Sequence, residues 1–146
     1  MTTPDYPLQP EPSLDSAPFW ASLKAGTLAI QRCTNCRQWQ FPPLETCRHC
    51  RGELVQEPLS GRGTIHTYIV EHRRVAPGFD HLLPYAIALV APEEAPQVRL
   101  PGRIVDKPEA VSIGAAVEAE IVDVAGSDYK VAVFRLTAPG DQGPES

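Results

Sequence analysis

The chain has 146 residues, 42% of them hydrophobic and 21% charged, which suffices for one domain with its own core, or for a small domain with an appendage. Its net charge of −5 argues against sequence-independent binding to nucleic acid or to an anionic membrane surface, because both depend on Lys and Arg neutralising negative charge. Sixteen prolines and ten glycines favour short strands and turns over long helices.

The N-terminal part predicts a tail followed by one short helix. Residues 1–13 carry four prolines and few large apolar side chains, so we expect a flexible tail or an arm that orders against a partner. Residues 14–26 predict the helix, with Asp15 or Ser16 as its cap and Gly26 as its stop signal. The N-terminal region has neither the basic nor the apolar segment of an export signal, so we expect a cytoplasmic protein.

All four cysteines lie within eighteen residues, as the C-x-x-C pairs Cys33/Cys36 and Cys47/Cys50. Each pair forms a turn that brings two thiolates together, and two facing turns make a tetrahedral four-sulfur site. Zn²⁺ suits this site, because a d¹⁰ ion tolerates the geometry and thiolates bind it well. Four sulfur ligands leave no open position for substrate. We therefore predict a structural Zn²⁺ that stabilises a ribbon, residues 27–59, too small to have its own core.

Two alternatives to zinc stay open for the cysteines. Iron is the main rival metal, and it would colour the purified protein. Two disulfides are the second alternative, although cytosolic thiols are kept reduced and the chain has enough apolar residues for a core elsewhere.

Arginines surround the cysteine pairs. Between residues 28 and 54 there are four arginines against Glu45 and Glu53, a net charge of +2, which would offset the −2 of zinc with four thiolates. The alternative is that they contact a phosphate of a nucleotide or nucleic acid. From residue 60 onward the chain carries a net charge of −4, which disfavours a polynucleotide partner. These arginines are Arg32, Arg37, Arg48 and Arg51.

Beyond the ribbon, residues 60–138 predict a small closed or nearly closed barrel, because five strand-like runs follow one another with no helical period among them. In one run Val117, Ala119 and Ile121 alternate with two glutamates, the period of a strand with one wet face. Residues 139–146 predict a polar tail. The five runs are 63–73, 83–92, 97–106, 115–124 and 129–138.

The residues offer no self-sufficient active site. The cysteines are assigned to metal, and the sequence has no nucleophile elbow, metalloprotease motif, phosphate loop or dinucleotide fingerprint. His66 and His72 share one face of the first barrel strand at i and i+6, and His81 lies in the following loop. A lone strand histidine is more often a surface residue than a general base. We therefore expect a chain that is not catalytic alone.

The motifs "FW", "QRCTNC", "FPP", "CRHC", "GRGTIHTYIVEHR", "PGF", "PYAIALV" and "IGAAVEAEIVDV" follow one another between about Phe19 and Leu136. In this order they resemble the acyl-CoA-associated zinc-ribbon and OB-fold family, long catalogued as a domain of unknown function. The resemblance implies a mainly β fold: an N-terminal helix, a rubredoxin-like zinc ribbon holding Zn²⁺ through the four cysteines, and a C-terminal five-stranded OB-fold barrel. Members often carry an arginine soon after "FPP", where this chain has Leu44, so a contact through that arginine is not carried over.

The resemblance also implies a partner. Members are usually subunits that join thiolase-superfamily proteins of the sterol-carrier-thiolase type, and some are joined to a hot-dog-fold hydratase. The complexes make or break carbon–carbon bonds in acyl-CoA thioesters, by thiolysis, Claisen-type condensation, acyl transfer or retro-aldol cleavage of steroid side chains. We expect such a subunit here, one that stabilises its partner and shapes the substrate channel, with no nucleic-acid or membrane partner.

Several side chains are candidates for contact with the partner or with CoA. Trp39 and Phe41 could form an apolar patch facing a partner, or could pack within the ribbon or against the helix. The segment 71–85 is the candidate loop at the partner's active-site mouth, where Arg73 and Arg74 could meet CoA phosphates. The full set is Phe19, Trp20, Trp39, Phe41, His72, Arg73, Arg74, Phe79 and Tyr85. Two rival functions stay open: a nucleic-acid-binding ribbon and OB module, and a stand-alone acyl-CoA-binding protein.

Overall fold

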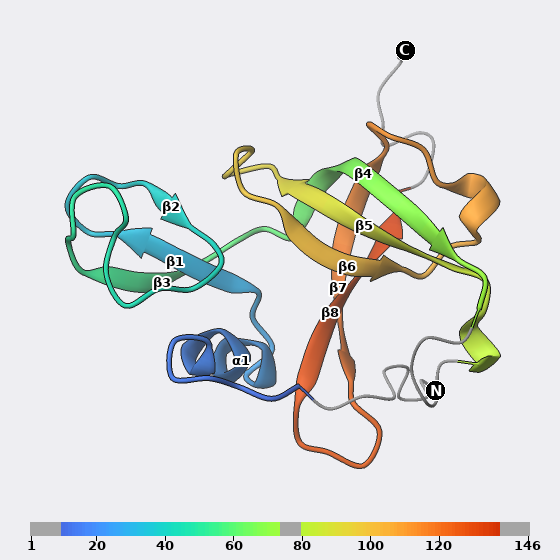
Figure 1. Ribbon diagram of the computed structural model, residues 1–146, viewed down its shortest axis with the longest axis horizontal. Helices are drawn as coiled ribbons and strands as arrows, with labels where there is room; N and C mark the ends of the chain where they lie inside the picture. Colours follow the sequence, from blue (N-terminus) through green and yellow to red (C-terminus); the bar gives the residue numbers. More distant parts are fainter. Residues whose placement is uncertain (1–9, 74–79, 138–146) are drawn as a thin grey trace. The chain divides into compact units, whose positions relative to one another are not determined.

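The computed structural model describes residues 10–73 and 80–137 (Figure 1). The chain divides into two compact units. The first contains the chain up to Ser60 together with Ile121–Val131, and the second contains Gly61–Glu120 and the chain from Ala132 onward. The elements are one α-helix, eight strands and two short 3₁₀ helices in the described residues, which confirms the mainly β fold.

The single α-helix, α1, spans Ala17–Lys24. The predicted side-chain cap is wrong: Ser16 occupies the N-cap position, but its side chain makes no bond to the first turn. Its backbone is helical (φ −92°, ψ −8°), whereas a capping residue is normally extended so that its oxygen can turn back to the helix. The Ser16 Oγ instead accepts a hydrogen bond from the N–H of Ser13 at 2.8 Å. Gly26, at φ +94°, follows the helix end.

A three-stranded antiparallel sheet forms the ribbon, in the order β2-β1-β3 (Figure 1). Its strands are β1 (Ala29–Cys33), β2 (Trp39–Gln40) and β3 (Leu54–Pro58). The central strand β1 is buried along almost its whole length, while β3 is half-buried or exposed. Most of the buried side chains of the ribbon strands therefore lie on β1, and one of them is a cysteine of the first pair.

A buried glutamine holds the long loop of the ribbon. The side chain of Gln31, on β1, donates from Nε2 to the carbonyl of Leu44 at 2.7 Å and accepts from the Leu44 N–H at 2.8 Å. Both polar ends of the amide are thus satisfied, as a buried amide requires. The loop between β2 and the second cysteine pair is consequently fixed at Leu44 through its backbone, independently of the side chain at that position.

The remaining strands form the predicted closed five-stranded barrel, in the order β4-β5-β6-β8-β7, an arrangement consistent with an OB fold. Neighbouring strands are antiparallel in the β4–β5, β4–β7 and β5–β6 pairs, and β6 and β8 run parallel. The elements are β4 (Arg62–Glu71), η1 (Asp80–Leu82), β5 (Tyr85–Pro92), β6 (Leu100–Ile104), η2 (Pro108–Ala110), β7 (Ala116–Asp123) and β8 (Lys130–Leu136).

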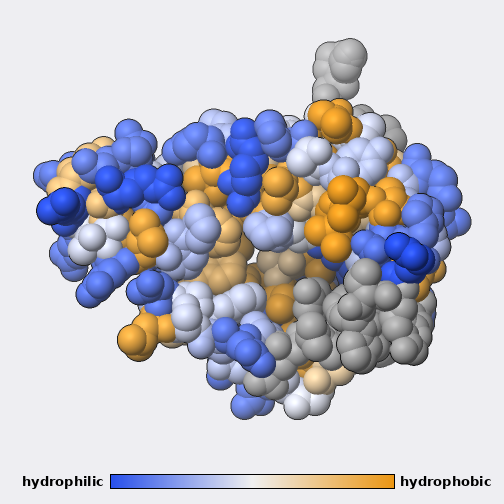
Figure 2. All heavy atoms as spheres, viewed as in Figure 1, coloured by the Kyte–Doolittle hydropathy of each residue, from blue (hydrophilic) through white to orange (hydrophobic). Residues whose placement is uncertain are grey.

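The barrel encloses an apolar core. Ile65, Val90 and Phe134 are almost fully buried and come from three different strands. Gly102 on β6 makes room for the largest of them, because a Cβ at this position would lie 2.5 and 2.6 Å from two ring atoms of Phe134. Some large apolar side chains nevertheless reach the surface (Figure 2). In the barrel they include Ile69 and Ile113.

Strand β7 departs from the simple alternation expected for it. Val117 is buried, but Ala119 and Ile121 are only half-buried, and the next buried side chains are Val122 and Val124. The buried face therefore shifts by one residue near Ile121, so that a single period of two does not describe the whole strand. Among the described residues, no helix is long and apolar enough to cross a membrane.

Candidate metal centre

The four cysteines converge on one point in the ribbon. Their sulfur atoms all lie within 4.8 Å of one another. The Sγ atoms of Cys33 and Cys50 are 3.5 Å apart, and those of Cys36 and Cys47 are 3.6 Å apart. All four are free thiols, so the disulfide alternative is not realised. Tetrahedral zinc with Zn–S bonds of about 2.3 Å places its sulfurs about 3.8 Å apart, which these separations match.

In both cysteine turns, backbone N–H groups point at a cysteine sulfur and so favour the thiolate form. In the first turn the N–H groups of Asn35 and Cys36 point at the Cys33 Sγ, at 3.3 and 3.4 Å. In the second, the N–H of His49 points at the Cys47 Sγ at 3.3 Å. Donors aimed at sulfur stabilise negative charge there, as a metal-binding thiolate needs. The donor set therefore fits a divalent soft-ligand metal, and the four cysteines hold a structural Zn²⁺.

One of these ligands also receives a side-chain hydrogen bond. The Asn35 Nδ2 donates to the Cys50 Sγ at 3.6 Å. This bond, followed by that from the Gly52 N–H, lowers the pKa of Cys50 to about 6. For Cys36 the Gln38 N–H favours the thiolate, but burial and the neighbouring sulfurs outweigh it and raise the pKa of Cys36 to about 12. The hydrogen bonds around the site therefore favour the thiolate form of Cys50 more than that of Cys36.

The residue after each cysteine pair has an unusual backbone. Arg37 and Arg51 both have φ of +65°, a left-handed conformation in which glycine is the unstrained residue. Their N–H groups close the turns by donating to the carbonyls of Cys33 and Cys47, at 3.1 and 2.8 Å. The two turns are thus near copies of each other, and each holds an arginine where a glycine would cost less.

The four arginines around the metal centre divide into two kinds. Arg32 is 3.1 Å from the Glu57 carboxylate and lies over the Trp39 ring at 4.6 Å, and Arg37 is 3.6 Å from the same carboxylate. In the described part of the chain, Arg48 and Arg51 are exposed and no ion pair involves them. The first two arginines therefore have a carboxylate partner in the ribbon, and an offset of the zinc–thiolate charge by the four arginines stays a prediction.

Four of the predicted aromatic contact residues, namely Phe19, Trp20, Trp39 and Phe41, lie on the helix and the ribbon of the first unit. Phe19 packs edge-on against Trp20, with ring centroids 5.0 Å apart, and tilted against Phe41 at 5.6 Å. All are half-buried, as is Trp39. These contacts show internal packing, which leaves part of each ring accessible; contact with a partner through them stays a prediction.

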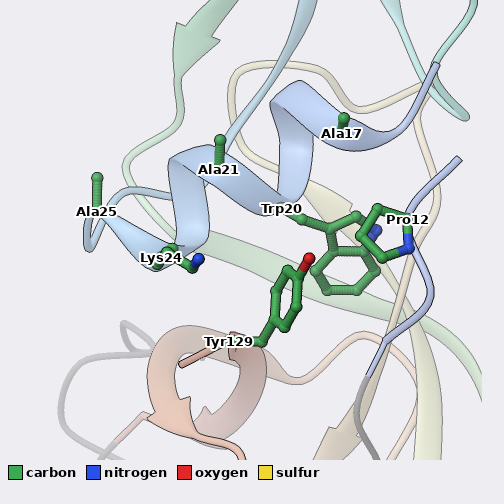
Figure 3. A pocket seen from close by; sticks show the side chains of 7 residues that line it. All are labelled: Pro12, Ala17, Trp20, Ala21, Lys24, Ala25 and Tyr129. Atoms are coloured by element: carbon green, nitrogen blue, oxygen red, sulfur yellow. The ribbon is translucent and has the colours of Figure 1, made fainter. Parts of the chain in front are cut away.

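Trp20 also lines a groove in the first unit (Figure 3). The groove has a volume of about 400 Å³, with Pro12 and Tyr129 beside the indole. The Lys24 ammonium lies 4.9 Å from the centre of the Tyr129 ring. The remaining wall is made by the small side chains of α1 and its end, which are Ala17, Ala21 and Ala25.

The predicted contact segment 71–85 is described only at its two ends. His72 and Arg73 are exposed. Arg74 and Phe79 lie outside the described residues. Tyr85 is only 5% exposed at the start of β5, so it is a buried residue of the barrel rather than a surface group.

The histidines do not form the shared face expected of them. A bulge between Ile65 and Thr67 interrupts the pairing of β4 at His66, and His72 lies just beyond the end of β4 at Glu71. His66, His72 and His81 are all exposed.

The sequence interpretation overlooked two polar residues, Gln31 and Asn35. The signal for Asn35 was present: it is a side-chain donor inside the first C-x-x-C turn. Its target sulfur, however, belongs to the opposite turn, which no local pattern reveals.

Together the four-sulfur site and the barrel define the class of protein: a zinc ribbon combined with an OB-fold barrel. Residues 20–55 match the family model of the ChsH2 rubredoxin-like zinc ribbon domain, and residues 56–122 match that of the ChsH2 C-terminal OB-fold domain. The chain belongs to this family, which is also called DUF35.

Relatives and solved structures agree with this assignment. A DUF35 domain-containing scaffold protein of Methanocaldococcus jannaschii is 47% identical over 105 residues, covering 68% of this chain and 72% of the relative. The 3-oxo-4,17-pregnadiene-20-carboxyl-CoA hydratase alpha subunit of Mycobacterium tuberculosis is 34% identical over 82% of this chain, which spans only 38% of that subunit. A chain of a solved structure described as Ltp2-ChsH2(DUF35) aldolase has a TM-score of 0.80 and 30% identity, covering 89% of this chain and 100% of that chain.

Proposed function

We propose that the chain is a non-catalytic accessory subunit of a heteromeric complex that processes acyl-CoA thioesters. The observation that carries this proposal is the similarity to the whole ChsH2(DUF35) chain of an aldolase whose description names a second component, Ltp2. The similarity to a steroid-CoA hydratase alpha subunit supports the same substrate class.

The partner in this proposal is a thiolase-superfamily protein of the sterol-carrier-thiolase type. It supplies the chemistry, which is cleavage or formation of a carbon–carbon bond in the acyl-CoA, such as retro-aldol cleavage of a steroid side chain or thiolysis. The chain stabilises this partner and shapes its substrate channel. A hot-dog-fold hydratase would be a third component, supported by the hydratase alpha subunit among the relatives.

The site chemistry supports a scaffold role for this chain. Four sulfur ligands saturate a tetrahedral zinc ion and leave no position for water or substrate. Among the described residues, the exposed His66, His72 and His81 have no carboxylate partner that would orient them as bases.

The test is to co-express the full chain with a thiolase-superfamily protein encoded beside it. We expect co-elution at a fixed stoichiometry, measured by size-exclusion chromatography with light scattering. Acyl-CoA substrates, including steroid side-chain thioesters, are then offered to the complex, to the partner alone and to this chain alone, with products separated by chromatography. Only the complex should turn them over at full rate. Turnover by the isolated chain, or failure of the two proteins to associate, would contradict the proposal.

The isolated chain tests the two rival functions. A salt-dependent shift of a labelled oligonucleotide by the isolated chain would favour a nucleic-acid-binding module. Tight binding of acyl-CoA to the isolated chain in calorimetry would favour a stand-alone carrier. We expect neither.

A further inference from the structure

The two cysteine turns can be compared position by position. In each turn the second residue between the cysteines donates its backbone N–H to the first cysteine: Asn35 to Cys33 and His49 to Cys47, both at 3.3 Å. Asn35 and His49 are therefore equivalent residues in two nearly identical turns. Any difference in what their side chains do is a difference between the two halves of the metal centre.

Their side chains differ in one contact. The Asn35 amide crosses to the opposite turn and donates from Nδ2 to the Cys50 Sγ at 3.6 Å. No hydrogen bond from the His49 ring to the described residues is found, and His49 is exposed. The metal centre thus receives a cross-turn amide on one side only.

Gly52 keeps the space for this contact. A Cβ at position 52 would lie 3.2 Å from the Asn35 Cβ and 3.2 Å from the Cys50 Sγ, and 2.9 Å from the Cys33 Sγ. These distances are tighter than nearly all real Cβ contacts, so a side chain here would press on the amide and on two ligands. Position 52 therefore has no room for a side chain beside Asn35 and these two ligands.

The cysteine that receives the amide is also the most exposed residue of the four. Cys33 is 0% exposed and Cys47 2%, Cys36 is half-buried, and Cys50 is exposed. Attack by an electrophile requires both access to the sulfur and electron density on it. A donated N–H withdraws density from a thiolate, and partners of this kind tune metal ligands measurably.

We propose that Cys50 is the sulfur at which carbon electrophiles open the zinc site, and that Asn35 is a positioning residue that restrains this reaction. The amide holds the accessible thiolate in place and lowers its nucleophilicity. The metal centre is protected by burial at Cys33 and Cys47, and by a hydrogen bond at Cys50, where burial is lacking.

The test uses the full chain loaded with zinc and a limiting amount of iodoacetamide. The attacking thiolate forms a C–S bond with the methylene carbon while iodide leaves, and the neutral thioether that results is a poor zinc ligand. Two readouts follow the reaction: the zinc released, measured with 4-(2-pyridylazo)resorcinol, and the position of the first label, measured by mass spectrometry of peptides. Neither readout depends on enzymatic activity.

In the unsubstituted chain we expect the first label on Cys50. Asn35→Ala should speed labelling and zinc release roughly three- to tenfold, the factor that one hydrogen bond is worth. His49→Ala is the matched control, because it removes the equivalent side chain without removing a bond to sulfur, and it should leave the rate unchanged. Each variant is first shown to bind one zinc per chain.

First labelling at Cys36, or equal labelling of several cysteines in the unsubstituted chain, would overturn the proposal. So would equal rates for Asn35→Ala and His49→Ala. If Asn35→Ala fails to bind zinc, the mapping of the first label in the unsubstituted chain still decides the role of Cys50. Asn35→Gln, which keeps the amide on a longer arm, then decides the role of Asn35. The labelling rate of Asn35→Gln should lie between those of the unsubstituted chain and of Asn35→Asp. The partner protein is not involved, so this outcome is independent of the proposed complex.

Discussion

The zinc ribbon and the barrel are both small β assemblies, but they are held together differently. The ribbon has strands of five, two and five residues, and two of its own ligands, Cys33 and Cys47, are among its most buried side chains. The barrel has strands of five to ten residues that bury Ile65, Val90 and Phe134. In the ribbon two ligands supplement a small set of buried apolar side chains that includes Ile30, whereas in the barrel apolar side chains supply the whole core. The stability of the first should therefore depend on metal and that of the second on packing.

Removing the metal should have the largest effect, and it should act on the ribbon and not on the barrel. Cys33→Ser, or chelation of the unsubstituted chain, is expected to unfold the ribbon, because apparent zinc-binding energies of about 10–16 kcal/mol become folding energy in such small pieces. The barrel strands should keep their protection. Hydrogen exchange followed by mass spectrometry reports both regions in one experiment. A ribbon that stays protected without metal would show that its own packing suffices.

The corresponding change for the barrel removes an apolar side chain from its core. Phe134→Ala removes a ring that is 2% exposed and should destabilise the barrel by about 3–5 kcal/mol, because the cavity left behind cannot fully collapse. Zinc content should stay at one per chain. Denaturant unfolding gives the stability and elemental analysis gives the metal. Ile113→Ala, at a side chain that is 68% exposed, is the control and should change stability by less than about 0.5 kcal/mol. Loss of zinc in Phe134→Ala would mean that the ribbon also depends on the barrel core.

The pH dependence of zinc binding should distinguish the two cysteine turns within the ribbon. Because the Asn35 amide, followed by the Gly52 N–H, lowers the pKa of Cys50 to about 6, this sulfur is mostly a thiolate at pH 7.5 and should release few protons when zinc binds. In Asn35→Ala the pKa should rise, although the Gly52 N–H still lowers it, so zinc binding should release more protons at this pH than in the unsubstituted chain, by up to about one. Zinc affinity should then fall more steeply as the pH is lowered from 8 to 7.

Calorimetry in two buffers of different ionisation enthalpy counts these protons. His49→Ala should release the same number as the unsubstituted chain. An equal count for Asn35→Ala would show that the amide does not govern the charge on Cys50.

The smallest expected effect concerns the two arginines in left-handed conformation. Arg51→Gly should stabilise the zinc-bound ribbon by up to about 1 kcal/mol, because glycine adopts this φ without strain. Arg37→Gly relieves the same strain but also removes the ion pair with Glu57 at 3.6 Å, so its gain should be smaller. The chelator concentration at half release of zinc measures both. Destabilisation by Arg51→Gly would show that this guanidinium has a stabilising contact within the chain.

The sequence by itself determined the features that depend on local spacing. The two C-x-x-C pairs predict the sulfur site, because each turn needs only four consecutive residues to bring two thiolates together. The barrel strands could also be predicted from the sequence, since apolar runs between turn residues indicate strands without knowledge of their pairing partners.

Only the tertiary structure decided which distant groups meet. Asn35 binds a sulfur fifteen residues away, and Gln31 fixes the backbone of Leu44 thirteen residues away. Ser16 lost its capping role to a neighbouring turn, and Tyr85 proved buried although its position in the chain suggested a contact residue. For Asn35, Gln31 and Tyr85 the physical reason is the same: hydrogen bonds and burial are set by the register and packing of segments far apart in sequence, and no local pattern encodes that arrangement. The Ser16 contact differs, because its partner Ser13 lies only three residues away.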